Sequence, residues 1–177
     1  SDKILERMNR KHTISEYHKI FDKLKDINCD IEFSSDFIIG YPGEEEDDFQ
    51  ATFELIKRVK FINSFSFIFS PRPGTVAADL ELIDKKISME RLEIIQNQLF
   101  DHQINMNKSL ENKIINVLVE NLTDDKTQAF GRSEHMTPVI FNGKKEDIGK
   151  ILPVRITKSN RSTLFGEINN NSNQKVA

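Results

Sequence analysis

The first part of the chain combines apolar patterns of helical period with short apolar runs that end at turn residues. In four segments apolar residues recur at three- and four-residue steps, which predicts helices that each bury one face. The predicted helices cover residues 2–9, about 15–28, 44–59 and 88–107, and the predicted strands cover 31–41 and 63–70. A helix between two strands predicts a right-handed βαβ crossover in a parallel sheet.

Individual residues indicate where the helices begin and end, and one acid, Asp36, lies in an apolar strand. Ser15 is expected to cap the second helix and Asn28 to end it. The five acids at 44–48 begin the third helix, where the helix dipole favours negative charge, and we expect them to be solvated. Asp36 is the one charged residue in the run 34–42, which reads as a buried strand and a turn. A carboxylate there requires either buried partners or an accessible site, because desolvation disfavours its charged form.

After residue 110 the apolar pattern changes to short runs rich in β-branched residues. Five such runs, separated by glycine and asparagine turns, predict strands at 114–120, 128–132, 138–141, 148–157 and 164–168. Five short strands in about 60 residues predict a small all-β barrel of the OB type, a shape that often binds nucleic acid. The predicted fold class is therefore α/β for 1–109 followed by an all-β barrel at 110–169, and the asparagine-rich tail 170–177 is expected to be disordered.

Composition narrows the classes of protein that this chain can represent. It has 177 residues, 37% of them hydrophobic, and no long apolar run, so we expect a cytoplasmic protein without a membrane span. The single cysteine, Cys29, excludes an internal disulfide, cannot alone hold a zinc or iron–sulfur centre, and is expected to be a core thiol. The net charge of −3 argues against a uniformly basic nucleic-acid binder, although residues 110–177 carry 10 Lys and Arg against 8 Asp and Glu.

Basic residues supply the candidate binding chemistry. Arg72 lies between two prolines that restrict the backbone, so its guanidinium can grip a phosphate or carboxylate with little loss of entropy; a surface ion pair is the alternative. Arg10 belongs to a basic cluster at 7–12. This cluster can bind an anion, or it can complement the dipole at the end of the first helix. In the barrel region basic residues interleave with phenylalanines, a pattern that suits RNA backbone contact and base stacking unless the phenylalanines form the core. These basic residues are Arg132, Lys144, Lys145, Arg155, Lys158 and Arg161.

Three blocks in the first part resemble the radical SAM methylthiotransferases in residues, order and spacing. The blocks are SDKILERMNRKHT at 1–13, SDFIIGYPGE at 35–44 and FSPRPGT at 69–75. Because it contains Arg72, the third block resembles the branch of the family that makes 2-methylthioadenosine in tRNA more than the branch that modifies a ribosomal protein. The branch that acts on threonylcarbamoyladenosine in tRNA is also similar and remains an alternative. The second part is similar to the TRAM domain that ends these enzymes, in GRS at 131–133, VIF at 139–141, IGK at 148–150 and LFGEI at 164–168.

The resemblance implies the last part of a radical SAM barrel, at 1–109, joined to a TRAM domain at 110–169. The complete enzyme of this branch converts N6-isopentenyladenosine beside the anticodon to its 2-methylthio derivative, using S-adenosyl-L-methionine (SAM) and two 4Fe–4S clusters. The cysteine motifs for those clusters are absent from the 177 residues. We therefore expect the chain alone to be catalytically inert, and SAM cleavage or iron–sulfur absorbance would contradict this. The implied partners are the anticodon stem-loop of tRNA and the sulfur and electron donors of the complete enzyme, with no membrane.

The resemblance also implies roles for individual residues. In related radical SAM barrels an arginine and an aspartate contact SAM at the positions that match Arg10 and Asp36. A guanidinium suits the methionyl carboxylate, and a carboxylate accepts hydrogen bonds from ribose hydroxyls. Arg72 is expected to contact tRNA or substrate, and the six basic residues of the barrel to bind RNA. No catalytic residue and no metal ligand are assigned.

Two other classes of function stay open on the sequence. A non-catalytic RNA-binding module would bind tRNA at full affinity without a further polypeptide. A different α/β enzyme would bind another ligand with Arg10 and Asp36. The residues encoded before Ser1 would separate these possibilities, because the cysteine motifs are either present there or not.

Overall fold

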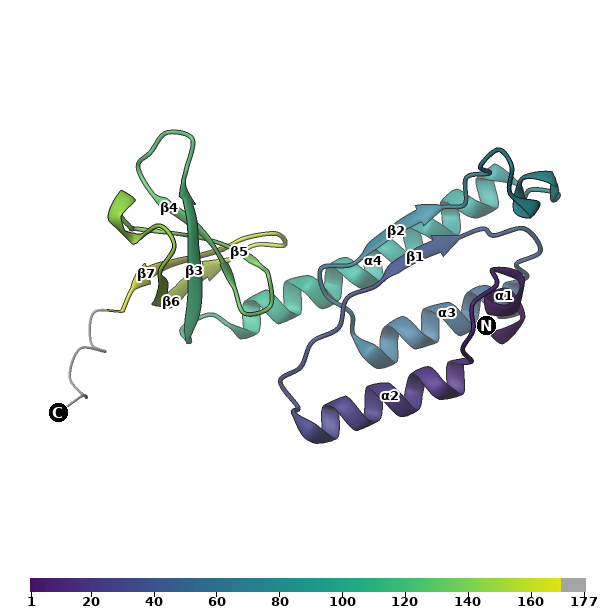
Figure 1. Ribbon diagram of the computed structural model, residues 1–177, viewed down its shortest axis with the longest axis horizontal. Helices are drawn as coiled ribbons and strands as arrows, with labels where there is room; N and C mark the ends of the chain where they lie inside the picture. Colours follow the sequence, from purple (N-terminus) through teal and green to yellow (C-terminus); the bar gives the residue numbers. More distant parts are fainter. Residues whose placement is uncertain (170–177) are drawn as a thin grey trace. The chain divides into compact units, whose positions relative to one another are not determined.

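A computed structural model describes residues 1–169 and divides the chain into two compact units (Figure 1). The first unit comprises Ser1–Leu99, and the second begins at Phe100. The tail 170–177, for which the sequence predicted disorder, lies outside the described residues.

The first unit contains a two-stranded parallel sheet with its connecting helix. Its elements are α1 (Asp2–Arg7), α2 (Ile14–Ile27), β1 (Asp36–Ile39), α3 (Glu46–Val59), β2 (Phe65–Ile68), the 3₁₀ helix η1 (Val76–Asp79) and the first part of α4 (Lys85–Ser109). β1 pairs with β2 in parallel register, with Asp36 opposite Phe65 and Ile39 opposite Ile68. The predicted parallel strand–helix–strand unit is therefore confirmed.

Both strands are shorter than the apolar pattern predicted. Regular pairing begins only at Asp36, because the Ser35 amide donates to the side-chain oxygen of Ser64 at 2.9 Å and Asn63 has a positive φ of 47°. β1 is also buried on one side only, since Ile39 is buried while Asp36 is exposed. The prediction of a buried strand is wrong for the outward half of its side chains.

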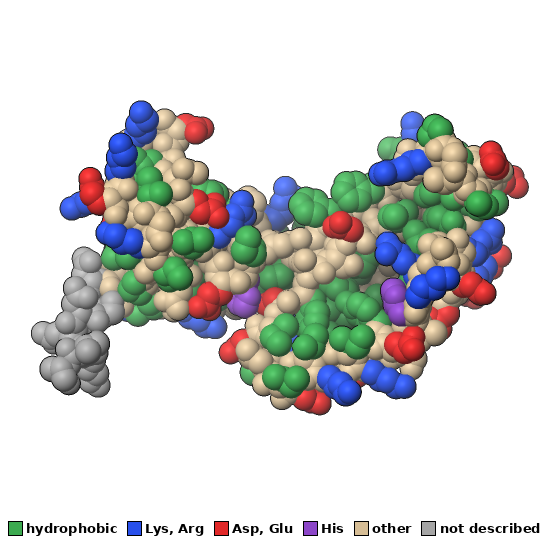
Figure 2. Space-filling view, in the orientation of Figure 1, with side chains coloured by type: hydrophobic (Ala, Val, Ile, Leu, Met, Phe, Trp, Pro, Cys, Tyr) green, Lys and Arg blue, Asp and Glu red, His purple; other side chains and the backbone are tan. Residues whose placement is uncertain are grey.

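One face of the sheet is covered and the other is open. Side chains of β1, α3 and α4 form the core of this unit together with Phe61, and the core residues are Phe37, Ile39, Phe49, Ile56, Val59, Phe61, Ile95 and Leu99. On the open face Phe65 is 64% exposed, Phe67 54% and Ile38 40%. Figure 2 shows hydrophobic side chains gathered on this unit, with Lys and Arg side chains near the end that carries α1. The open face, with its basic surroundings, is therefore accessible to a ligand.

The N-terminus of α2 differs from the prediction. Thr13 is the N-cap, because its hydroxyl accepts from the Glu16 amide at 3.2 Å while the Glu16 carboxylate accepts from the Thr13 amide at 2.8 Å. This reciprocal pair is a capping box, whose signature is Thr followed three residues later by Glu. The prediction of Ser15 as the cap is therefore wrong, whereas Asn28 ends the helix as predicted.

The second unit is a closed five-stranded barrel. Its strands are β3 (Ile114–Leu122), β4 (Ala129–Ser133), β5 (Pro138–Phe141), β6 (Ile151–Ser159) and β7 (Leu164–Ile168), with the 3₁₀ helix η2 (Lys145–Asp147) before β6. They close in the order β3-β4-β5-β7-β6, with β5 and β7 parallel and the other pairs antiparallel. Alternate side chains point inward, and Phe141 is the largest of the fully buried ones. The predicted five-stranded barrel is confirmed, although β6 begins three residues later than expected.

Candidate functional site

The turn after β1 brings the end of the strand against α4. Gly40 has a φ of 71°, a left-handed conformation that residues with a Cβ rarely adopt. A Cβ at this position would lie 2.5 Å from the Ser88 hydroxyl, so α4 could not pack as closely. The Gly40 amide donates to Glu44 Oε2 at 3.2 Å. Glycine at position 40 and glutamate at position 44 therefore close this turn together.

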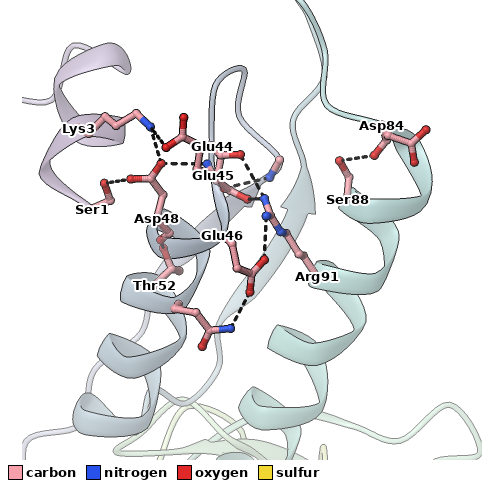
Figure 3. A network of polar contacts seen from close by, with 12 residues as sticks. Ser1, Lys3, Glu44, Glu45, Glu46, Asp48, Thr52, Asp84, Ser88 and Arg91 are labelled. Atoms are coloured by element: carbon pink, nitrogen blue, oxygen red, sulfur yellow. Dashed lines mark hydrogen bonds and ion pairs between the residues drawn. The ribbon is translucent and has the colours of Figure 1, made fainter.

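Glu44 is buried and forms an ion pair with Arg91 of α4 (Figure 3). Arg91 Nη1 donates to Glu44 Oε1 at 2.8 Å, and Nη2 donates to Glu46 Oε2 at 3.0 Å. The guanidinium also lies over the Phe49 ring, 5.2 Å from its centroid. Only 8% of Arg91 and 9% of Glu44 is exposed. Burial raises the pKa of Glu44, and the hydrogen bonds from Arg91 and the Gly40 amide oppose that rise.

Asp48 of α3 is the second buried acid of this region, and it holds the beginning of the chain. Ser1 Oγ donates to Asp48 Oδ1 at 2.6 Å, while Lys3 Nζ and the Glu45 amide donate to Oδ2 at 3.0 and 2.9 Å (Figure 3). Burial by itself raises the pKa of Asp48, but these three hydrogen bonds outweigh burial and lower that pKa to about 2. The charged form of Asp48 therefore stabilises the contact between α1 and α3.

The structure divides the acidic run into an inner and an outer set. Glu44 and Asp48 are buried, whereas residues 45–47 are exposed. The expectation that all five acids are solvated is therefore wrong for these two. Both acids can be buried because basic partners elsewhere in the chain neutralise them. One of these partners could have been found in the sequence, since Arg91 is a cation on the core-facing side of a long helix.

Replacing Asp48 by asparagine should lower the free energy of unfolding of the first unit by about 2 kcal/mol at neutral pH. Because the folded-state pKa of about 2 lies below the ordinary value of 3.8, this stabilisation is complete above the ordinary pKa and is lost as the pH falls through about 2. The difference between the two proteins should therefore shrink over that range. The chain has two tyrosines, Tyr17 and Tyr41, and no tryptophan, so tyrosine fluorescence during urea unfolding reports on this unit.

The matched control for this substitution is Asp47→Asn. Asp47 lies in the same first turn of α3 but is exposed. Its replacement should change the free energy of unfolding by less than about 0.5 kcal/mol. Equal losses in the two variants would contradict the role assigned to Asp48.

The end of α1 fixes the backbone of Arg10. The Arg10 amide donates to the Leu5 carbonyl at 2.8 Å, and the Asn9 amide donates to the Glu6 carbonyl at 2.8 Å. Asn9 has a φ of 58°, so these bonds form a Schellman motif with asparagine in the left-handed position. Arg10 thus follows directly after a hydrogen-bonded helix end.

Asp36 and Arg10 line one hollow of about 320 Å³, which we call the Asp36 hollow. Asp36 is exposed, and its side chain forms no hydrogen bond or ion pair with any residue in the described range 1–169, so it is not a core carboxylate satisfied by neighbours. Apolar side chains such as Leu5, Met8 and Ile38 supply other parts of the wall. A free carboxylate, a guanidinium and apolar walls suit a ligand that carries hydroxyl groups, a carboxylate and an aromatic part.

A second hollow shares Arg10 with the first and lies at the carboxyl ends of β1 and β2. We call it the Arg72 groove; it has a volume of about 700 Å³. Its basic side chains are Arg7, Arg10 and Arg72, and its aromatic side chains are Tyr41, Phe67 and Phe69. The structure thus brings Arg10 together with Asp36 in one hollow and with Arg72 in the other. Sequence reasoning placed Arg7 only in a general basic cluster, and no local pattern marked it for this groove.

On the barrel, Arg132 and Arg155 are held by neighbouring groups. Arg132 Nε lies 3.3 Å from Glu120 Oε1, its Nη1 donates to the Met136 carbonyl at 3.1 Å, and its guanidinium is 5.9 Å from the centroid of Phe130. Arg155 Nη1 donates to the Asn112 carbonyl at 3.1 Å. These two arginines lie on β4 and β6, the strands that flank β3.

The other predicted basic residues of the barrel are exposed at different places. Lys158 is near the end of β6 opposite Phe165, and Lys144 and Lys145 lie at η2. The Arg161 guanidinium lies 4.2 Å from the centroid of the Phe100 ring. The basic residues of the barrel are therefore distributed over several strands and loops.

Among residues 1–169, no three His, Cys, Asp or Glu side chains are gathered where they could hold an ion. Cys29 is exposed after α2, so the expectation of a core thiol is wrong. One cysteine cannot supply the thiolates of an iron–sulfur cluster. None of the helices in this described range has the length and apolar character that a membrane span requires.

Part of each unit matches a known protein family. Residues 1–56 match the radical SAM superfamily, and residues 108–168 match the TRAM domain. The two units are therefore similar to these two domains, each in the residues that match. The chain is similar to the C-terminal part of proteins named tRNA-2-methylthio-N(6)-dimethylallyladenosine synthase, which confirms the resemblance inferred from the three sequence blocks.

Three of these relatives show the extent of the similarity. The protein of Pelagibacter ubique (strain HTCC1062) is 63% identical over 177 residues, which are all of this chain and 40% of that protein. The protein of Ruthia magnifica is 41% identical over 169 residues, and that of Rickettsia akari is 42% identical over 170 residues. Each of these two alignments covers 95% of this chain and 38% of the relative. The chain thus spans about two fifths of the length of the relatives that it matches.

Proposed function

We propose that this chain acts as the C-terminal part of a tRNA methylthiotransferase that converts N6-isopentenyladenosine beside the anticodon to its 2-methylthio derivative. The observation that carries this proposal is the 63% identity over all 177 residues to a protein named as that synthase. The relatives quoted above carry dimethylallyladenosine in their names, which favours this substrate over threonylcarbamoyladenosine. In this proposal residues 1–109 belong to the radical SAM domain and 110–169 to the TRAM domain.

The Asp36 hollow is the proposed wall of a SAM site. The Arg10 guanidinium would bind the methionyl carboxylate, and the free Asp36 carboxylate would accept hydrogen bonds from the ribose hydroxyls. The residues fit such a ligand, because Asp36 has no competing partner in residues 1–169 and apolar side chains lie beside it. When bound in the complete enzyme, SAM supplies the methyl group and the radical that the reaction requires.

The complete enzyme would need cluster ligands and donor proteins that these 177 residues do not supply. The ligands of the two 4Fe–4S clusters would come from other residues, because the 177 residues contain one cysteine. We also propose a sulfur donor and an electron donor as partners of the complete enzyme, and the cytoplasm as its location. The chain alone is proposed to be catalytically inert for the same reason.

The barrel is proposed to bind the anticodon stem-loop of tRNA. Phosphate contacts from Lys and Arg fix the position of an RNA more than they read its sequence. Arg132, held over Phe130 by Glu120, would present a guanidinium with little loss of entropy. Arg72 is proposed to contact the same RNA from the first unit.

Replacing Lys158 or Arg132 by alanine should weaken binding of an anticodon stem-loop RNA to the chain, because each change removes a cation from the barrel. Each substitution should reduce the slope of log affinity against log salt by about 1 if the lost contact is to one phosphate. Fluorescence anisotropy with a labelled stem-loop at several salt concentrations measures both quantities.

Lys57→Ala is the control for these variants. Lys57 is an exposed lysine of α3 that pairs with Glu54 at 2.9 Å in the first unit. Its replacement should leave the affinity and the salt slope unchanged. Unchanged affinity in both barrel variants would contradict an RNA-binding role for Arg132 and Lys158.

A further inference from the structure

We propose that the Arg72 groove binds a single-stranded nucleotide of the RNA substrate, with its phosphate between Arg7 and Arg72 and its base against Phe67. This inference rests on the proposed function and adds a second RNA contact that is separate from the barrel. It names Arg7 as a binding residue and assigns the groove to RNA rather than to SAM.

The charge of the groove calls for an anionic ligand. Three of its lining side chains are arginines, Arg7, Arg10 and Arg72, and none is an acid. None of the three forms an ion pair with a residue in the described part of the chain. By contrast, Arg58 and Arg91 each pair with a carboxylate at 2.8 Å. Guanidinium groups without a partner in a concave site match the planar, bidentate geometry of a phosphate.

The floor of the groove suits a base. Phe67 lines the groove and is among the exposed aromatic residues of the open sheet face. Its ring lies nearly parallel to that of Phe65, with an interplanar angle of 15° and centroids 6.4 Å apart. Exposed aromatic faces beside cations are the usual surface for unstacked bases of single-stranded RNA. A volume of about 700 Å³ is in the range of pockets for small ligands, which favours one or two nucleotides over a helical stem.

The backbone that carries Arg7 is held in place. The Tyr41 hydroxyl donates to the Arg7 carbonyl at 3.0 Å, which ties the end of α1 to the turn after β1. In that turn Gly43 has a φ of 83°, and the space where its Cβ would be is filled by the Arg7 guanidinium. Arg7 therefore packs against bare backbone at the rim of the groove.

The turn that carries Arg72 is held as well. The Arg72 carbonyl accepts from the Thr75 amide at 3.2 Å and from the Thr75 hydroxyl at 2.8 Å. Prolines on both sides restrict its backbone further. Because the backbone at both arginines is already held, binding a phosphate costs little backbone entropy there, which favours affinity.

The test measures binding of an anticodon stem-loop RNA to the 177-residue chain with Arg7→Gln, Arg72→Gln, the double variant and Phe67→Ala. The double variant should bind about tenfold more weakly or worse, and its salt slope should fall by about 0.7, because the two arginines share one phosphate and a single-strand phosphate contact contributes about 0.7. Phe67→Ala should weaken binding by at least fivefold with an unchanged salt slope, because it removes stacking and no charge. Arg58→Gln, which removes an exposed arginine of α3 paired with Asp22, should change neither quantity.

The outcomes separate this inference from the proposed function. If Lys158→Ala weakens RNA binding while the Arg7, Arg72 and Phe67 variants bind like the unsubstituted chain, the inference is overturned and the proposed function stands. If the unsubstituted chain does not bind the stem-loop, both are overturned. A polyglutamate peptide that binds through Arg7 and Arg72 more tightly than the RNA does would also overturn the inference, because it would identify an acidic protein as the ligand.

Discussion

Replacing Arg91 by methionine should lower the free energy of unfolding of the first unit by about 3–5 kcal/mol, because it leaves Glu44 buried without a counter-charge. Glu44 and Arg91 are both buried, and the ion pair between them joins the turn after β1 to α4. Glu44 also accepts from the Gly40 amide, so its displacement would loosen the turn itself. Tyrosine fluorescence during urea unfolding measures the change, since both tyrosines lie in this unit.

Two further variants test the cause of that loss. Arg58→Met breaks an ion pair of equal length, 2.8 Å, between two half-exposed side chains, and it should cost less than about 1 kcal/mol. Combining Arg91→Met with Glu44→Gln removes both charges and should recover more than half of the stability lost in Arg91→Met. Similar costs for Arg58→Met and Arg91→Met, or no recovery in the double variant, would contradict the role of the buried pair.

Replacing Arg10 or Asp36 by alanine should weaken the binding of SAM by about tenfold or more, since a hydrogen bond to a charged group contributes about 1.5–3 kcal/mol. Neither side chain forms a hydrogen bond or ion pair with another residue in 1–169, and both are exposed. The free energy of unfolding should therefore change by less than about 0.5 kcal/mol. Loss of binding without loss of stability distinguishes a ligand-binding role from a structural one. Saturation-transfer NMR of SAM with the 177-residue chain measures the affinity.

Asp26→Ala is the control for the SAM experiment, because Asp26 is an exposed acid of α2 outside the lining of both hollows. It should leave the saturation transfer unchanged. Equal binding by the Arg10, Asp36 and Asp26 variants would contradict the assignment. Saturation transfer that is absent from the unsubstituted chain would show that the Asp36 hollow does not make a SAM site by itself.

The sequence predicted the barrel more accurately than the ends of the elements in the first unit. Two of the five barrel strands, β5 and β7, have the predicted boundaries, because alternation of inward and outward side chains is a local pattern. The predicted strand at 31–41 was too long, because its apolar residues continue beyond the regular pairing. Asn63 and the Ser64 hydroxyl interrupt that pairing on the partner strand, and hydrophobicity alone does not report such an interruption.

In the candidate site, too, residues within local sequence blocks were predicted, whereas contacts between residues far apart in the chain were not. The match of Arg10, Asp36 and Arg72 to sequence blocks selected three residues that line two adjoining hollows. The buried pair of Glu44 and Arg91 was not predicted, because its members are far apart in the chain and meet only when α4 packs on the turn. Arg7 was not singled out for a related reason, since its surroundings are created by the turn at Gly43.

The turn at Gly43, against which Arg7 packs, also has a consequence for evolution. A Cβ at position 43 would overlap the guanidinium, and the φ of 83° already disfavours residues other than glycine. The Arg7 guanidinium is the far end of a flexible side chain and could move aside from a Cβ at position 43. The backbone conformation at position 43, more than the contact with Arg7, should therefore retain glycine in related natural sequences.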